Sequence, residues 1–407
     1  MVPPFFFGGI CGSFVISAAR AMHEGLASFS QSPEVPMRAQ SLAITFAFFL
    51  LLAGLVAATA VDAQTAAGTL ELKPGRERAV VAVVALNTHT EVTDFLVPYG
   101  ILNQAGATVM AVAPSADPIA FWPAASARPD ADFAAFDAAY PDGADIVIVP
   151  AVMEPDNAVL LGWLRDQAAG GALMVSICEG ASVLASAGLF DGKRATGHFY
   201  EHGSRVKRYP HVDWQRNVRY VEDEGVISSS GVSASLPISL MLAERLAGAE
   251  RAREIAAAYG VTDYGPEHDS EAFSIGVPEV TTALKNMAFG WPRAHYLIEV
   301  RDGVDEVDMA FPLDFAARTW RGSSASFAAK AEVTTRHGLV VIADETGDAP
   351  KGTRLVRLPG APEGGPEVAV TLADPATLRE DFLAFIGEDL GPGTAHFVAT
   401  QLEYPRE

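Results

Sequence analysis

The sequence predicts an α/β fold: a three-layer α/β/α sandwich on a mostly parallel sheet, followed by a degenerate second copy of the same unit. Three observations support this prediction. Short apolar runs alternate with segments of helical length, and the runs are apolar at successive positions, as in strands buried on both faces. Parts of the first half also recur near the C-terminus.

The predicted elements of the first half follow one another with short connections. Strands are expected over 79–86, 107–113, 145–150, 172–177 and 225–231, and helices over 93–104, 157–169 and 231–258. In a doubly wound sheet, ligands bind at the carboxyl ends of the strands. Residue Cys178 immediately follows one such end.

Cys178 lies where an apolar strand becomes a helix of small residues. Such a turn can hold a nucleophile in a fixed position, and Gly180 allows close approach of the backbone. Because a helix N-terminus favours the thiolate, we expect a lowered pKa for Cys178. The alternative is a buried structural cysteine, which is common in strands of this composition.

The second half repeats features of the first. The segment 91–98 is echoed by 305–312, with Asp and Pro four residues apart in both, and each follows an apolar strand. The predicted helices 240–256 and 382–399 share a Gly-x-x-x-Ala step. Nothing after residue 294 resembles the turn at Cys178. We infer a duplicated domain whose second copy has lost its catalytic middle; chance similarity is the alternative.

The N-terminal residues predict export. Residues 42–61 carry no charge, and 37–63 have the pattern of a secretory signal, with Met37 as the expected start and cleavage after Ala63. The expected location is therefore periplasmic or secreted, with transient membrane contact through the signal. A retained membrane anchor is the alternative.

The predicted organisation has five parts. These are an N-terminal extension with the signal (1–63), a linker (64–78), a catalytic domain (79–262), a second linker (263–293) and a second copy without the nucleophile (294–407).

Composition excludes some partners. The net charge of −21 is a poor match for a nucleic-acid polyanion. No metal-type Cys/His spacing is present, so neither a metal nor another cofactor is predicted. The other cysteine, Cys11, precedes the signal, so an exported chain keeps Cys178 without a disulfide partner.

Five segments carry a resemblance to the DJ-1/PfpI superfamily of class I glutamine-amidotransferase-like domains, a flavodoxin-like fold. They are 94–98, 145–150, 176–189, 192–198 and 228–234. The chain is most similar to the branch with isonitrile hydratases and the amidase-like domains of AraC-type regulators. The helix-turn-helix of those regulators is not evident, which disfavours a DNA-binding role.

The resemblance implies roles for three side chains. Cys178 would be the nucleophile, Asp94 the carboxyl group hydrogen-bonded to it, and His198 a general base or orienting group. We expect Asp94 to be protonated, since two anions in contact repel. Alternatively, Asp94 is a helix N-terminal residue stabilised by the dipole, and His198 is solvated in its loop.

Backbone N–H groups of Glu179 and of Ala151 or Val152 are the predicted oxyanion hole. Two of these positions depart from the family. Ala151-Val152 stands where a Gly-Gly pair is usual, and Glu179 stands where isonitrile hydratases have threonine. A carboxylate at Glu179 would raise the pKa of the cysteine unless it is paired.

Basic residues are concentrated in 193–219. They could attract an anionic substrate, or form a solvated loop salt-bridged to Glu201, Asp213 and Glu222. The function expected is a cofactor-independent cysteine hydratase or hydrolase acting on a small molecule. The alternative is an exported, non-catalytic ligand-binding or redox-sensing module. The chain is expected to form a homodimer or an intrachain pseudo-dimer.

Overall fold

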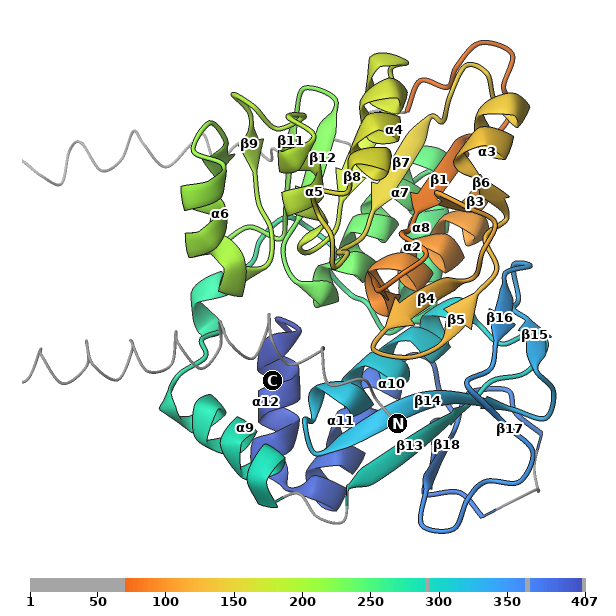
Figure 1. Ribbon diagram of the computed structural model, residues 1–407, viewed down its shortest axis with the longest axis vertical. Coiled ribbons are helices and arrows are strands. Elements are labelled where there is room, and N and C mark those ends of the chain that lie inside the picture. The colour runs from red at the N-terminus through yellow and green to blue at the C-terminus, as the bar shows by residue number, and fades with distance from the viewer. Residues whose placement is uncertain (1–69, 290–292, 363–366, 405–407) are drawn as a thin grey trace, which may run out of the picture. The chain divides into compact units, whose positions relative to one another are not determined.

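A seven-stranded sheet is the centre of the first region in the computed structural model, which describes residues 70–289, 293–362 and 367–404 (Figure 1). The strand order is β11-β12-β8-β7-β1-β3-β6, and all neighbours are parallel except β11 and β12. The strands are β1 (Val80–Val84), β3 (Thr108–Ala113), β6 (Ala131–Asp132), β7 (Ile146–Val149), β8 (Leu173–Ser176), β11 (Tyr220–Asp223) and β12 (Val226–Ser229).

Helices cover both faces of this sheet. They are α2 (Val92–Gln104), α3 (Phe133–Ala139), α4 (Ala158–Ala169), α5 (Gly180–Ser186), α6 (His202–Arg208), α7 (Ser235–Ala247) and α8 (Ala249–Ala258). Alternate residues of β1 join separate cores: Val81 and Val83 pack in the cluster of α2 and α7, whereas Val80 and Val84 pack in that of α4 and α5. The predicted three-layer sandwich is confirmed.

The second region contains a five-stranded parallel sheet in the order β17-β14-β13-β18-β19. Its strands are β13 (Ala294–Glu299), β14 (Gly322–Ala328), β17 (Glu345–Thr346), β18 (Arg354–Arg357) and β19 (Val370–Thr371), and its helices are α10 (Glu306–Arg318), α11 (Leu378–Leu390) and α12 (Pro392–Gln401). β13 lies between β14 and β18 just as β1 lies between β3 and β7. This arrangement is compatible with a degenerate second copy.

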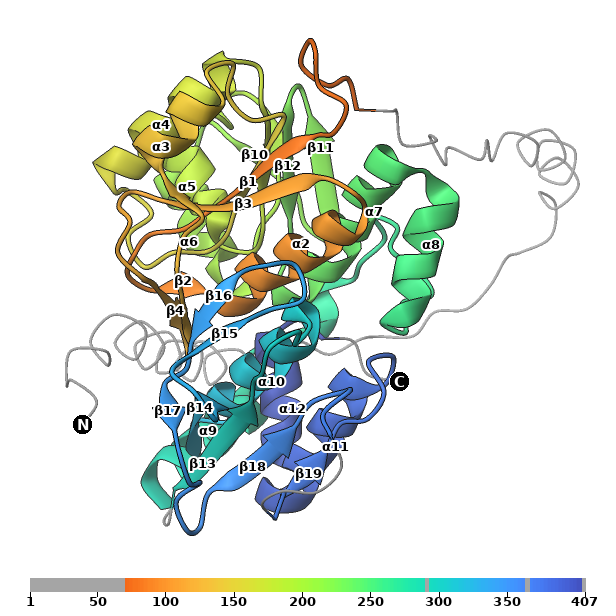
Figure 2. The same cartoon turned by 90° about the vertical axis from the view of Figure 1, so that its right-hand side faces the viewer.

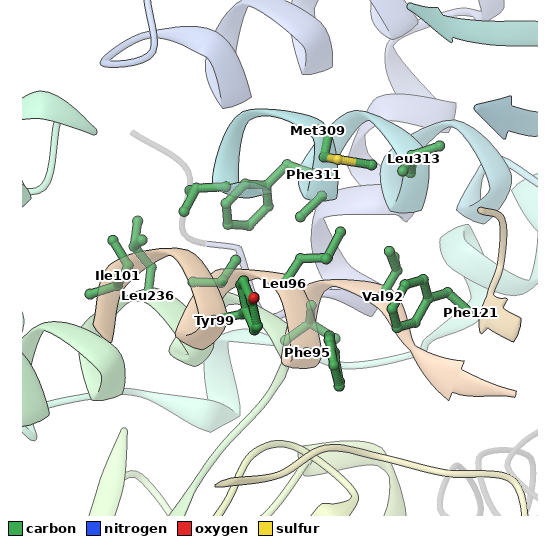
Figure 3. Packing of buried hydrophobic residues seen from close by; sticks show 14 of the residues in the cluster. Val92, Phe95, Leu96, Tyr99, Ile101, Phe121, Leu236, Met309, Phe311 and Leu313 are labelled. Carbon is green, nitrogen blue, oxygen red and sulfur yellow. The ribbon is translucent and has the colours of Figure 1, made fainter. Parts of the chain in front are cut away.

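The two regions share a core and a third sheet. α2 packs against α10 in one apolar cluster, to which Leu96, Tyr99 and Phe311 belong (Figure 3). The third sheet has the order β15-β16-β5-β4-β2, in which β16 of the second region pairs with β5 of the first (Figure 1). Figure 2 shows β16 near β4 of the same sheet. Its strands are β15 (Glu332–Thr334), β16 (Val340–Ile342), β5 (Ser126–Ala127), β4 (Ile119–Trp122) and β2 (Thr90–Glu91).

Some sequence expectations need correction. The long helices predicted near 240–256 and 382–399 are each two helices, broken at Gly248 (φ 84°) and Gly391 (φ 97°), the glycines of the shared step. The predicted second linker contains helix α9 (Val277–Phe289) and the 3₁₀ turn η4 (Ser270–Ala272). Short elements near the site are β9 (Arg194–Ala195), η2 (Phe199–Glu201), β10 (Asp213–Trp214) and η3 (Val232–Ala234).

The predicted signal segment and Cys11 lie outside the described residues. Within the described ranges, no helix combines the length and apolar character needed to cross a membrane.

Candidate functional site

Cys178 lies on a tight turn between β8 and α5. It is the free cysteine of the described part, has a φ of 55°, and is 6% exposed. The Ile177 N–H donates to the Val149 carbonyl at 3.0 Å, and the Gly180 N–H donates to the Ile177 carbonyl at 2.8 Å. A Cβ at residue 180 would lie 2.0 Å from the Val149 oxygen, so this turn requires glycine. A left-handed cysteine held this tightly indicates a functional constraint.

Asp94 lies in the first turn of α2 and is fully buried. Its Oδ2 accepts from the Ala151 N–H at 3.1 Å, and its own N–H donates to Glu91 Oε2 at 2.6 Å. The Glu91 N–H donates to the Ala151 carbonyl at 2.9 Å, which closes a ring of three residues. Asp94 Oδ1 is buried without a hydrogen-bond partner. Burial raises the pKa of Asp94 to about 7, against the lowering effects of the Ala151 N–H and Arg318.

The predicted lowering of the Cys178 pKa is wrong. Burial raises the pKa of Cys178 well above its ordinary value, and the carboxyl groups of Asp94, Glu91 and Glu179 raise it further. Asp94 has the largest effect among these charges, and Arg318 acts in the opposite direction. The N-terminus of α5, a helix of seven residues, does not bring the pKa of Cys178 below its ordinary value.

The predicted oxyanion hole needs one correction. The Ala151 N–H is already used by Asp94, so it is not free for a substrate oxygen. In the described part of the chain, the N–H groups of Val152 and Glu179 have no hydrogen-bond acceptor. Neither Ala151 nor Val152 has a positive φ, so the missing Gly-Gly pair causes no backbone strain here.

Glu179 is paired rather than left beside the thiol as a free anion. Its carboxylate accepts from Arg205 Nη1 and from the Ser182 hydroxyl. Arg205 is buried, lies 5.2 Å from the Trp214 ring centroid, and donates through Nη2 to the His198 carbonyl at 2.7 Å. The carboxylate of Glu179 is therefore held by Arg205 and Ser182.

His198 is not bonded to the cysteine or to Asp94. Its Nε2 lies 2.8 Å from the Gln401 carbonyl of α12, and its Nδ1 accepts from the Tyr200 N–H at 3.4 Å. Both ring nitrogens are thus committed to backbone groups. The predicted general-base role has no support in this geometry, because a base must reach the proton that it accepts.

The sequence reasoning missed Arg318 and Glu91. Arg318 extends from α10 of the second region and donates through Nη2 to Glu91 Oε1 at 3.2 Å. Its guanidinium also lies 4.8 Å from the Trp122 ring centroid. The sequence feature that could have identified Arg318 is the repeated motif, because Arg318 lies six residues after Pro312 in the second region.

The basic residues of 193–219 are largely paired, although not with the predicted acids. The observed pairs are Arg194–Asp223, Arg208–Asp156, Arg216–Glu271 and Arg219–Asp263. The predicted partner Glu222 instead pairs with Arg245.

Comparison with known proteins agrees with this geometry. Residues 79–245 match the model of the DJ-1/PfpI family. The chain is 34% identical to Protein dj-1beta of Drosophila melanogaster over 120 residues, covering 28% of this chain and 63% of the relative. It is 32% identical to isonitrile hydratase of Pseudomonas putida over 117 residues, covering 27% and 48%. The chain thus spans less than two thirds of each of these relatives.

Among solved structures, Drosophila melanogaster DJ-1beta is similar with a TM-score of 0.41 and 24% identity. The alignment covers 46% of this chain and all of that one.

Proposed function

We propose, from the premise that residues 79–245 form a domain of the DJ-1/PfpI family, that the protein is a cofactor-independent cysteine hydratase or hydrolase. One observation carries the proposal. The buried Asp94 has an unpartnered Oδ1 and is the charge that most affects the thiol of Cys178. Because Oδ2 accepts from a backbone N–H, a proton on this carboxyl group belongs on Oδ1.

The proposed chemistry uses Cys178 as the nucleophile and Asp94 as the proton donor. With an isonitrile, sulfur bonds to the terminal carbon while Asp94 gives its proton to that carbon and takes up the proton of the thiol, giving a thioimidate. Water then adds to that carbon, the carbon–sulfur bond breaks, and an N-substituted formamide leaves as the proton returns to the site. The net reaction converts an isonitrile and water into an N-substituted formamide. The N–H groups of Val152 and Glu179 are the proposed donors to developing negative charge.

We propose an uncharged substrate rather than an anionic one. Arg318, the cation that lowers the pKa of Cys178, donates to both Glu91 and Asp314. Arg205 is committed to Glu179. Both arginines are therefore already paired with carboxyl groups, so neither is free to bind an anionic substrate.

A substrate assay with matched variants tests the proposal. Small uncharged isonitriles and amides are incubated with the protein, and products are followed by mass spectrometry. Cys178→Ala should abolish turnover, whereas Cys11→Ala should leave it unchanged. Asp94→Asn should reduce turnover by about 100-fold, the usual size of a lost proton-transfer contribution. Turnover that persists in Cys178→Ala would refute the proposed nucleophile.

A second candidate is a non-catalytic binding or redox-sensing module. The raised pKa of the buried Cys178 and the absence of a bond from His198 to it favour the binding role, because a redox sensor needs a more readily ionised thiol. A binding module should retain ligand affinity in Cys178→Ala, measured by calorimetry with any isonitrile or amide that binds the wild-type protein. Loss of both affinity and turnover in a folded variant would count against it.

We also propose that the second region takes the place of a partner subunit. The contact of α2 with α10 supports this arrangement. Mass photometry or light scattering should then give a single chain, at most 42.9 kDa. A tight homodimer would contradict the proposal.

A further inference from the structure

Arg318 joins the second region to the candidate site. It is the last residue of α10, and its side chain is 11% exposed. Nε donates to Asp314 Oδ1 at 2.7 Å, one turn earlier on the same helix, and Nη2 donates to Glu91 Oε1 at 3.2 Å. One guanidinium thus connects carboxylates from α10 and from the N-terminus of α2.

Glu91 links this arginine to the catalytic carboxyl group. Its Oε2 accepts the Asp94 N–H, so the side chain caps α2, while Oε1 accepts from Arg318. Glu91 is fully buried by its neighbours, and a buried carboxylate is costly unless it is paired. Burial and the charges of Asp314 and Asp94 raise the pKa of Glu91, whereas Arg318 lowers it.

The remaining contacts hold the arginine in place. The Trp122 ring of β4 lies beside the guanidinium, and the Arg318 carbonyl accepts from Gln401 Nε2 at 2.9 Å. The carbonyl of Gln401 in turn lies 2.8 Å from His198 Nε2. Elements of both regions therefore fix Arg318, and through Glu91 they fix the first turn of α2.

We propose that the second region is a built-in part of the active site, with Arg318 as the positioning residue that holds the Glu91 cap of α2 in place and supplies the positive charge that favours the Cys178 thiolate. The inference rests on the proposed function only in taking Cys178 as the reacting group. Its alternative is a salt bridge that stabilises the contact between the regions and has no effect on the thiol.

The second region offers a matched control. Asp305 caps α10 as Glu91 caps α2, and Arg336 Nη1 donates to Asp305 Oδ2 at 2.6 Å. Arg336 is not among the main charges that shift the pKa of Cys178. Removing Arg336 therefore removes a cation from an equivalent helix cap with a smaller expected effect on the thiol.

The test is the alkylation rate of Cys178 by iodoacetamide from pH 5.5 to 10, followed by mass spectrometry of its peptide, for wild type, Arg318→Met, Arg318→Lys and Arg336→Met. We expect alkylation at pH 8 to slow by about tenfold in Arg318→Met, because loss of a nearby opposite charge disfavours the thiolate. Arg318→Lys should restore part of the rate, and Arg336→Met should match wild type.

Circular dichroism and melting curves establish that the compared variants are folded. An unchanged alkylation profile in folded Arg318→Met overturns the inference. If Arg318→Met does not fold, Arg318→Lys serves as the test, because lysine keeps the charge but cannot reproduce both hydrogen bonds. An alkylation profile of Arg318→Lys equal to that of wild type would then overturn the inference. The measurement requires no turnover, so it distinguishes failure of this inference from failure of the proposed function.

Discussion

The two regions carry the same buried aspartate at the start of a helix, but its surroundings differ between them. Asp94 and Asp308 each lie in the first turn of a helix that follows the central strand of their sheet, and burial raises the pKa of each to about 7. The first region adds the turn that carries Cys178. In the second, β19 has only two residues, and α11 begins at Leu378. The carboxyl motif therefore persists without a nucleophile.

The residues that cross between the regions also differ. Six residues after the helix proline, the second region has Arg318 and the first has Gln104. Arg318 meets Glu91 as a cation, whereas Gln104 donates to the Tyr259 hydroxyl at 2.6 Å, and that hydroxyl donates to Asp305 at 3.0 Å. The comparison teaches that charge compensation across the contact is supplied to the cap nearest the cysteine. The opposite cap, Asp305, receives a neutral contact from Tyr259 across the contact and a cation, Arg336, from its own region.

The largest effect is expected from a substitution that disrupts the turn at Cys178, which is unique to the first region. Gly180→Ala places a Cβ 2.0 Å from the Val149 carbonyl oxygen, so we expect a loss of about 4 kcal/mol or more of unfolding free energy. Gly162→Ala in α4, where a Cβ meets nothing within 4 Å, should be neutral or stabilising. Urea denaturation measures both, and equal stabilities would show that the turn tolerates a side chain.

The second prediction concerns the buried aspartates that the two regions share. Burial raises the pKa values of Asp94 and Asp308 to about 7 in the folded state, above the ordinary value of 3.8 for an aspartate. The folded state thus binds the extra protons, and each group's stabilisation is present below pH 4 and lost as the pH rises through 7. Each loss is about 4 kcal/mol over the whole pH range, by the free energy of a pKa shift.

Urea titrations at pH 5 and pH 8 check this prediction. Asp94→Asn and Asp308→Asn should each reduce the decline in stability between the two pH values, because neither amide titrates. A decline that neither substitution changes would mean that these carboxyl groups do not control it.

A smaller effect is expected at the two helix breaks. Gly248 (φ 84°, ψ 162°) and Gly391 (φ 97°, ψ 149°) adopt backbone angles that are nearly restricted to glycine, and an added Cβ would clash with nothing. Alanine at either position should cost about 2 kcal/mol through backbone strain alone. Melting temperatures should fall by similar amounts in the two variants. A large difference would separate the two breaks and weaken the comparison.

The sequence was sufficient to predict the parallel sheet and the turn at Cys178, because apolar runs and small residues determine both locally. The breaks at Gly248 and Gly391 were not predicted, since a glycine within a helical pattern is compatible with a continuous helix. The contacts of Arg318 with Glu91 join positions far apart in the chain, and no local pattern identifies such a pair. The raised pKa of Cys178 likewise depends on burial and on carboxyl groups assembled by the fold.

The most direct test of the account is whether Asp94 and Cys178 titrate as a coupled pair. The pH profile of Cys178 alkylation is measured in wild type, Asp94→Asn and Asp308→Asn. We predict an inflection near pH 7 in wild type, where ionisation of Asp94 disfavours the thiolate. The inflection should disappear in Asp94→Asn and remain in Asp308→Asn. A wild-type profile without it, or one that Asp94→Asn leaves unchanged, would contradict the pairing on which the proposed function depends.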